Sequence, residues 1–328
     1  MTILITGGAG FIGSHMALRL RDEGEDVVVI DNLRTGFAWA VPDGVELIIG
    51  DIGDRGLVES TIQRRRINAI IHFAGSVVVS ESVADPLGYY LNNTIKSRDL
   101  IACATATGVP HFIFSSTAAV YGDTDSVAIS EDAPTRPASP YGTSKLMTEM
   151  MLRDAAAAHP FTYTALRYFN VAGADPQTRT GQATRGATHL VKVACEAALG
   201  IRPVLEIFGT DYPTADGTCV RDYIHVWDLV AAHSLALRRL RSGGGNLVAN
   251  CGYGKGYSVR QVVDAVRQVS GCSFEVSTRE RRPGDVASVV ADPAVARAQL
   301  GWKPQFDNIL TIVDHALKWE RVLRQRHT

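Results

Sequence analysis

Cysteine is scarce in this chain. Its 328 residues include five cysteines, and none of them forms a Cys-x-x-Cys pair. Scattered single cysteines are typical of reduced thiols in a cytoplasmic protein, and they argue against a disulfide framework. The histidines are likewise dispersed, without the spacing of metal ligands. We therefore expect a cytoplasmic protein that holds no metal ion.

The chain also lacks excess charge of one sign and long apolar runs. Thirty-three Lys and Arg stand against 34 Asp and Glu, which gives a net charge of -1 and predicts no positive surface for nucleic acid or an anionic membrane. No apolar run approaches the roughly 20 residues that span a bilayer. Met1 and Thr2 lead directly into a predicted strand, so we expect no leader peptide. Nucleic acid and membranes are therefore not expected as partners.

The first half of the sequence alternates short apolar runs with amphipathic stretches. The apolar runs are continuous, which predicts strands buried on both faces, as in a parallel sheet between two helix layers. This order predicts an α/β fold with a doubly wound parallel (Rossmann) sheet. The predicted strands are 2–6, 27–30, 46–49, 69–72, 111–115 and 162–168, and the predicted helices lie near 11–23, 54–66, 85–107 and 140–158.

The second half has a different rhythm. Residues 173–186 and 208–219 are rich in Gly, Thr, Pro and Asp and predict long loops, which in compact domains usually serve function. A helix is predicted near 187–199 and another over 309–324. We expect a nucleotide-binding domain over 1–172, to which a segment near 220–250 returns, and a smaller, loop-rich substrate lobe over 173–328.

A glycine motif follows the first predicted strand and opens the first predicted helix. Gly7, Gly10 and Gly13 would let backbone N–H groups approach a pyrophosphate at the positive end of the helix dipole. Asp31 ends the second predicted strand 18 residues after Gly13, close to the spacing of about 20 expected for the carboxylate that binds the adenine ribose. That carboxylate would repel a 2′-phosphate, so NAD is favoured over NADP, although Arg34 weakens the preference a little.

A tyrosine and a lysine four residues apart predict a catalytic base. Tyr141 and Lys145 would share one helix face, with Ser139 and Pro140 at N-cap and N1. A free phenol has a pKa of about 10, and a nearby ammonium and a helix N-terminus both favour the phenolate. A lone Tyr-x-x-x-Lys arises often by chance, but the hydroxyl cluster over 115–117 at a strand end strengthens the interpretation.

At this point the sequence resembles a known family. GGAGFIGSH, DNLRTG, GDI, HFAG, SSTAAVYG, SPYGTSK, LRYFN and VRDYIHVWDL resemble the extended short-chain dehydrogenase/reductases. The segment FGTDYPTADGTCVRDYIHV narrows the resemblance to the UDP-glucose 4-epimerase family, along nearly the whole chain. The resemblance implies interconversion of UDP-glucose and UDP-galactose by transient oxidation at C4 with bound NAD. It also implies a homodimer paired through the helices near 85–107 and 140–158.

The resemblance implies roles for particular residues. Tyr141 would be the base at the sugar 4-hydroxyl, Lys145 would lower its pKa and bind the nicotinamide ribose, and Thr117 would hydrogen-bond the 4-oxygen. The implied cofactor contacts are Gly7, Gly10, Phe11, Ile12, Gly13, Asp31, Asn32, Asp51, Ile52, Phe73, Ala74, Gly75, Asn92, Tyr141, Lys145 and Phe169. The implied UDP-hexose contacts are Thr117, Asn170, His189, Leu190, Phe208, Arg221, Arg282 and Val289, although Arg282 could also belong to a solvated charge run over 279–282.

Two positions depart from the family pattern. Val77 stands where members often carry a lysine near the cofactor phosphates, which predicts looser cofactor retention. Val289 stands where some members have a bulky tyrosine, so its small side chain leaves room for a 2-acetamido group. The alternative functions are therefore a UDP-N-acetylglucosamine 4-epimerase or a dual-specificity epimerase.

Three other interpretations are weaker. A 4,6-dehydratase would need an acid pair directly after Thr117, where the chain has Ala118 and Ala119. Another NAD-dependent nucleotide-sugar dehydrogenase shares the first half-reaction and would release NADH. A non-catalytic NAD-sensing protein could keep the glycine motif without keeping the tyrosine, the lysine and the hydroxyl cluster together.

Overall fold

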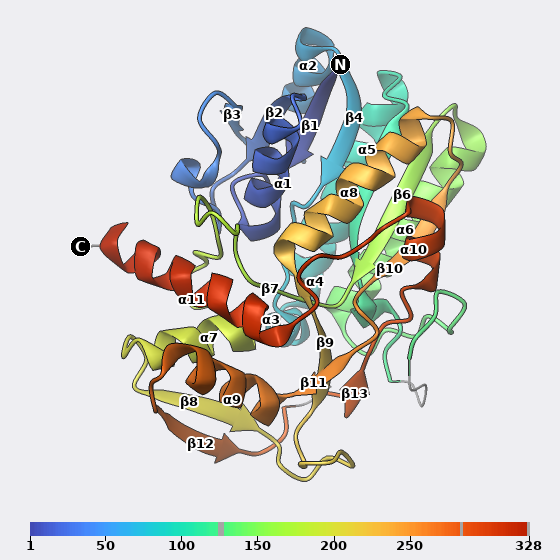
Figure 1. Cartoon of the computed structure of the whole chain (residues 1–328). Helices are drawn as coiled ribbons and strands as arrows, with labels where there is room; N and C mark the ends of the chain where they lie inside the picture. The colour runs from blue at the N-terminus through green and yellow to red at the C-terminus, as the bar shows by residue number, and fades with distance from the viewer. Residues whose placement is uncertain (124–127, 283–284, 327–328) are drawn as a thin grey trace.

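A seven-stranded parallel sheet forms the centre of the molecule, which is known from a computed structural model that describes residues 1–123, 128–282 and 285–326. The strand order is β10-β6-β5-β4-β1-β2-β3 (Figure 1). The bounds are β1 Thr2–Thr6, β2 Asp26–Asp31, β3 Glu46–Ile49, β4 Ile67–His72, β5 His111–Thr117, β6 Thr162–Tyr168 and β10 Leu247–Cys251. The predicted α/β fold with a doubly wound parallel sheet is thus confirmed.

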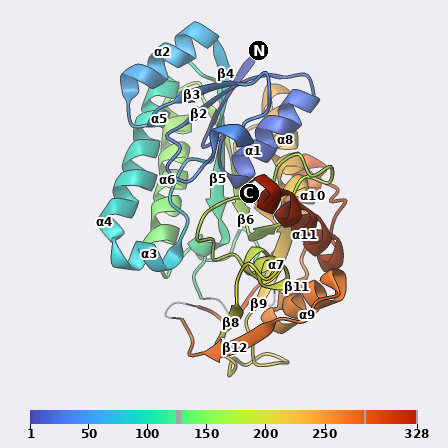
Figure 2. The same cartoon turned by 90° about the vertical axis from the view of Figure 1, so that its left-hand side faces the viewer.

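Helices cover both faces of this sheet (Figure 2). On one face lie α1 (Phe11–Asp22) and α8 (Val226–Arg241), and on the other α2 (Arg55–Arg65), α5 (Lys96–Ala106) and α6 (Pro140–Ala158). Side chains alternate between two cores, as expected for strands buried on both sides. Ile3 and Ile5 pack toward α1 and α8, whereas Leu4 packs toward α2 and α5.

A smaller lobe packs below the carboxyl ends of the strands. It holds the parallel pair β8 (Val204–Phe208) and β12 (Glu275–Arg279) with the helices α7 (Leu190–Ala198), α9 (Val259–Ser270) and α11 (Ile309–Arg326). A four-stranded sheet joins this lobe to the large sheet: β9 (Val220–His225) pairs with β7 (Asn170–Ala172), β11 (Gly256–Ser258) and β13 (Ser288–Val289). The short helix α10 (Ala294–Leu300) packs on α8 and β10.

The predicted helix near 85–107 is interrupted in the structure. It consists of α4 (Pro86–Tyr89), a π-helical turn η2 (Tyr90–Ile95) and α5, and it follows the unpredicted short helix α3 (Val79–Ala84). Hydrogen bonds explain the wider turn: the side chain of Asn93 accepts from the Ser76 N–H (2.7 Å) and donates to Ser76 O (2.9 Å). π-helical turns often mark functional sites. Short 3-10 turns, η1 (Ala38–Ala40) and η3 (Ala118–Val120), follow β2 and β5.

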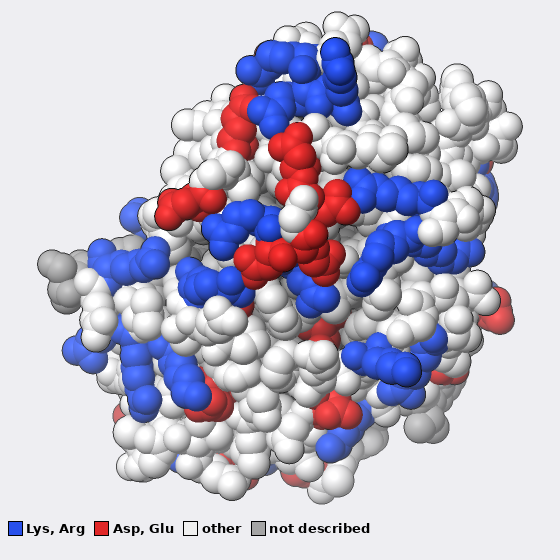
Figure 3. All heavy atoms as spheres, turned by 45° about the horizontal axis from the view of Figure 1, so that its top comes forward, with Lys and Arg blue, Asp and Glu red and all other residues white. Residues whose placement is uncertain are grey.

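One face of the molecule carries charges of both signs. On the face drawn in Figure 3 acidic and basic side chains are interleaved. Among the described residues, none of the helices combines the length and the apolarity needed to cross a membrane. All five cysteines are free, and four of them are buried.

Three core histidines make the stability of the protein depend on pH. Burial lowers the pKa of His15 and His233 to about 4 and that of His72 to about 3. In the unfolded chain these imidazoles regain a pKa of about 6.5. Between about pH 6.5 and pH 4 the unfolded state therefore binds more protons than the folded state. Their contribution to the free energy of unfolding is complete above pH 6.5 and falls as the pH is lowered through this window.

We expect His233→Gln to reduce this pH dependence. Urea unfolding between pH 6 and pH 5 should give a slope of free energy against pH that is shallower than in the wild type by about 1 kcal/mol per pH unit. His15→Gln should have a similar effect, because that imidazole is also buried. Unchanged slopes in both variants would contradict the prediction.

Candidate active site

Three predicted catalytic side chains are buried together between β5 and α6. Thr117 is the last residue of β5, Tyr141 lies in the first turn of α6, and Lys145 follows one turn later. As predicted, Ser139 caps α6: its hydroxyl accepts from the Gly142 N–H (3.2 Å), and Pro140 is the first helical residue. The Lys145 ammonium donates to Ser115 O (3.0 Å) and lies 5.0 Å above the Phe114 ring.

The pKa values of this cluster depend mainly on burial. Burial raises the pKa of the Tyr141 phenol, and a hydrogen bond with Thr117 opposes that rise. Burial also lowers the pKa of the Lys145 ammonium to about 8. The sequence predicted a lowered pKa for the Tyr141 phenol. In the structure the effect of burial exceeds that of the hydrogen bond, so the pKa is raised. A positive charge bound beside the phenol would act in the opposite direction.

The glycine-rich turn lies at the N-terminus of α1. Gly7 has a φ of +72°, and a Cβ there would come within 2.6 Å of Ala74 N, so this close approach requires glycine. A Cβ at Gly13 would lie 2.1 Å from Gly7 O. The N-cap Gly10 offers no capping side chain, and the first turn, with Phe11 and Ile12, contains no acid. The N–H groups at this helix end can therefore receive an anion such as a pyrophosphate.

Two carboxylates lie at the carboxyl ends of neighbouring strands. Asp31, at the end of β2, accepts from the N–H groups of Ala9 (2.9 Å) and Leu33 (2.8 Å), which ties it to the glycine-rich turn. Asp51, after β3 and next to the buried Ile52, accepts from the Lys96 ammonium (2.6 Å) and from Asn32 (3.3 Å). Although burial alone would raise the pKa of Asp51, these hydrogen bonds lower it.

Lys96 was not among the predicted site residues. The chain has only six lysines, and this scarcity was the one feature of the sequence that could have drawn attention to Lys96. The pairing with Asp51, 45 positions away, became visible only in the fold.

The end of β4 closes the site on its other side. The N–H groups of Phe73 and Ala74 donate to Thr6 O (2.9 and 3.1 Å), and a Cβ on Gly75 would lie 3.6 Å from the Lys145 ammonium. Asn92 donates to the Ser76 hydroxyl (3.0 Å). The predicted cofactor residues that follow β1 and β4, and Asp31 at the end of β2, thus lie at the carboxyl ends of these strands, where ligands of open α/β sheets bind.

The predicted substrate residues come mainly from the smaller lobe. The Arg282 guanidinium lies 3.7 Å above the ring of Phe208, at the end of β8, so it has a specific partner despite its exposed position. Arg221 on β9 lies 3.9 Å from the Asp285 carboxylate. His189, the N-cap of α7 before Leu190, hydrogen-bonds Gln182 (2.8 Å).

Val289 connects this group to the catalytic cluster. It pairs with Arg221 across β13 and β9, and it packs against the small core that contains Ala118 and Phe169. Ala118 directly follows Thr117, so Val289 lies on the catalytic side of the lobe. Asn170, at the start of β7, is exposed, and the contact that fixes it is the β7–β9 pairing.

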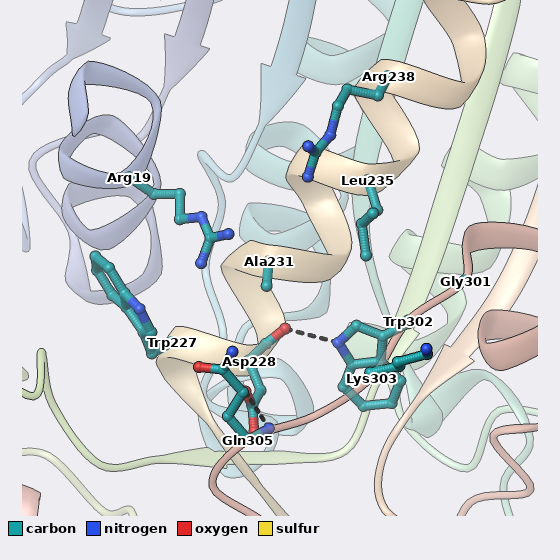
Figure 4. A pocket seen from close by; sticks show the side chains of 10 residues that line it. All are labelled: Arg19, Trp227, Asp228, Ala231, Leu235, Arg238, Gly301, Trp302, Lys303 and Gln305. Atoms are coloured by element: carbon teal, nitrogen blue, oxygen red, sulfur yellow. Dashed lines mark hydrogen bonds between the residues drawn. The ribbon is translucent and has the colours of Figure 1, made fainter. Parts of the chain in front are cut away.

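A separate cavity of about 170 Å³ lies between α1, α8 and the segment 301–305 (Figure 4). It is lined by Arg19, Trp227, Asp228, Ala231, Leu235, Arg238, Gly301, Trp302, Lys303 and Gln305. The Asp228 carboxylate accepts from the Gln305 and Phe306 N–H groups, and Trp302 donates to Asp228 O, so these groups fix the segment. None of the predicted site residues lines this cavity.

Within residues 1–123, 128–282 and 285–326, no group of three or more His, Cys, Asp or Glu could hold a metal ion. The glycine-rich turn, the open end of α1 and the acid at the end of β2 fit a dinucleotide.

Comparison with known proteins decides the family. The model of the "NAD dependent epimerase/dehydratase family" matches residues 3–252. The chain belongs to this family. Within the epimerase/dehydratase family, a UDP-glucose 4-epimerase of Azospirillum brasilense is 56% identical over 323 residues, covering 98% of this chain and 93% of that protein.

Solved structures of the epimerase/dehydratase family have the same fold. A UDP-glucose 4-epimerase from Brucella ovis in complex with NAD has a TM-score of 0.94 and 43% identity, with 97% of each chain covered. A UDP-Glc/GlcNAc 4-epimerase from Campylobacter jejuni has a TM-score of 0.85 and 44% identity, covering 98% of this chain and 99% of that one.

Proposed function

We propose that this chain interconverts UDP-glucose and UDP-galactose, with NAD as its bound cofactor. The observation that carries the proposal is the buried cluster of Tyr141, Thr117 and Lys145 beside a dinucleotide-type glycine turn. The relatives named UDP-glucose 4-epimerase, which match almost the whole chain, support the same reaction.

When bound, NAD would supply a hydride acceptor and donor for C4 and a positive charge in the site. The Tyr141 phenolate would take the proton of the 4-hydroxyl and later return it, so that no net proton is lost. Thr117, which hydrogen-bonds this phenol, would hold the sugar 4-oxygen at the same point. Lys145, one helical turn away with a pKa of about 8, would favour the phenolate.

Inversion at C4 requires a substrate that is held at one end and free at the other. We assign the UDP end to the smaller lobe, where Phe208 offers a ring to the base and Arg221 and Arg282 offer planar guanidinium groups to the diphosphate. The hexose would then pivot near Val289. On this assignment residues 1–172, with a segment near 220–250, bind NAD, and residues 173–328 mainly bind the UDP-sugar.

A proton NMR time course of the purified protein with UDP-galactose tests the function. Without added NAD, the UDP-glucose anomeric signal should grow to a plateau with no net NADH. Net accumulation of NADH would instead indicate a dehydrogenase. No change, even with NAD supplied, would contradict the proposed function.

A second substrate pair is favoured by the small side chain at position 289. Val289 packs against the small core that contains Ala118, the residue after Thr117, and a larger residue at position 289 would narrow the hexose space. The relative from Campylobacter jejuni, which is described as a UDP-Glc/GlcNAc 4-epimerase and is 44% identical to this chain, supports a second substrate pair. We therefore propose that the chain also converts UDP-N-acetylglucosamine.

We expect Val289→Tyr to abolish most of this second activity. A steric conflict with the 2-acetamido group should lower kcat/KM for UDP-N-acetylglucosamine by about tenfold or more, since pocket shape typically discriminates by 10- to 200-fold. The kcat/KM for UDP-galactose should change much less, and it serves as the internal control. Failure of the wild-type protein to convert UDP-N-acetylglucosamine, while UDP-galactose reacts well, would refute the second proposal.

We also propose that the chain forms a homodimer in the cytoplasm. Exposed apolar side chains recur every four residues along α3, α4 and η2 and continue on the adjoining α6; they are Val83, Leu87, Leu91, Ile95, Met147 and Met150. A continuous apolar surface of this kind is typical of an interface. The free cysteines support a reducing compartment. A sedimentation mass of one chain would contradict the dimer.

A further inference from the structure

The loop between β2 and β3 packs directly against the glycine-rich turn. The Phe37 N–H donates to Ala9 O (3.0 Å), while the Ala9 N–H donates to Asp31 (2.9 Å). A Cβ on Gly36 would lie 2.8 Å from the Ala9 backbone, so the two segments touch through backbone atoms. Movement of the loop 32–41 would therefore disturb the turn that opens α1.

The C-terminal helix contacts the same loop through aromatic rings and a cation. Trp39 lies 5.3 Å from Phe37 and 6.2 Å from Trp319 on α11, measured between ring centroids. The Arg326 guanidinium lies 4.9 Å from the Trp39 ring and 5.6 Å from the Trp319 ring. In Figure 1 the C-terminal end of α11 accordingly lies below the loop that joins β2 to β3.

Trp319 gives this contact a rigid base. It is 1% exposed, and its indole N–H donates to Gln182 O (3.1 Å). A Cβ at Gly181 would lie 2.3 Å from its ring, so only glycine allows the ring to pack so closely. The buried Lys192 ammonium pairs with Glu320 on the next position of α11 (2.6 Å). By contrast, Trp39 is 39% exposed, and its two partners from α11 are Trp319 and Arg326.

We propose that Trp39, Trp319 and Arg326 form a C-terminal latch that holds loop 32–41 over the adenine side of the bound dinucleotide and so slows its release between turnovers. The proposal rests on the NAD requirement of the proposed function and extends it to cofactor retention. Asp31, the predicted ligand of the adenine ribose, directly precedes this loop, and Phe37 anchors the loop to the glycine-rich turn. The contacts of the latch residues join loop 32–41 to α11, whereas Tyr141 lies on α6, so we assign them a positioning role and no part in the chemistry.

The test compares the release of NAD from the wild-type protein, Trp39→Ala and Arg326→Ala. NAD content per chain is measured by acid extraction at intervals of dialysis. Each variant removes ring or cation contacts at the exposed side of the latch, and we expect NAD loss about tenfold faster, which corresponds to about 1.4 kcal/mol. Trp39→Phe keeps a ring and should restore slow release. Arg321→Ala, on an exposed position of the same helix, is the matched control and should retain NAD like the wild type.

A second readout separates retention from chemistry and from general damage. With NAD in excess, kcat and the KM for UDP-galactose of Trp39→Ala and Arg326→Ala should return to within about twofold of wild type, while the concentration of NAD needed for half-maximal activity rises about tenfold. Equal NAD loss from the wild-type protein and both variants would overturn the latch alone, as would equally fast loss from Arg321→Ala. A wild-type protein that binds no NAD would overturn the proposed function and the latch together.

Discussion

Tyr141→Phe is expected to lower kcat by about a thousandfold, since positioned proton transfer typically contributes 10²–10⁴-fold. The substitution removes the phenol oxygen that hydrogen-bonds Thr117 and leaves the buried ring in place. The affinity for UDP should stay within about threefold of wild type, because the proposed UDP contacts lie in the other lobe. Initial rates with UDP-galactose and calorimetric titration with UDP measure the two quantities.

Tyr163→Phe is the matched control for this experiment. It removes the same atom from a buried tyrosine near the start of β6, at the opposite end of the strand from the site. Its kcat should remain close to wild type. Wild-type turnover by Tyr141→Phe would eliminate the proposed base, whereas an equal loss in both variants would indicate a general effect of losing a buried hydroxyl.

Glu149→Gln is expected to destabilise the protein by about 3–5 kcal/mol, the usual cost of leaving a buried partner charge unpaired. The Glu149 carboxylate on α6 accepts from Arg167 Nη2 (2.6 Å) and Nε (2.9 Å), and from the Ser116 hydroxyl (2.5 Å). Arg167 also donates to Tyr121, whose hydroxyl reaches Asn250 on β10 (2.7 Å). The pair therefore joins α6 to three strands. Urea unfolding at pH 7.5 measures the loss of unfolding free energy.

The double variant Glu149→Met with Arg167→Met tests the physical cause. Removing both charges abolishes the unpaired ion, and apolar replacements of buried pairs are often close to neutral. The double variant should therefore be more stable than Glu149→Gln. If Glu149→Gln lost less than about 1 kcal/mol, the pair would be no stronger than an ordinary surface ion pair.

Local patterns made much of the fold predictable. The glycine turn and the cap of α6 depend on residues within a few positions of one another, and both appear where the sequence placed them. The strands 2–6, 46–49 and 162–168 also have their predicted bounds, because continuous apolar runs report burial on both faces. The helix near 187–199 begins three residues later, at Leu190, after the N-cap His189.

Pairings between distant segments were not predictable from one sequence. In the sequence, Glu149 looks like an ordinary polar position on a helix. Only the fold shows that it forms an ion pair with Arg167 on β6. The π-helical turn η2 depends on Asn93 reaching Ser76, 17 positions earlier. In the smaller lobe, β12 has a mostly polar sequence that does not stand out as a strand, and it pairs with β8 across about 70 residues of intervening chain.

The late position of β10 in the chain has a consequence for biosynthesis. β6 is complete at residue 168, but the strand that covers its outer edge begins at residue 247. At 5–20 residues per second, the ribosome needs about 4 to 16 s to make the intervening chain. During that time the nascent sheet presents the whole length of β6 unpaired, the type of edge that recruits foreign strands. A chaperone that binds nascent chains would therefore contribute most in the interval before Cys251 emerges.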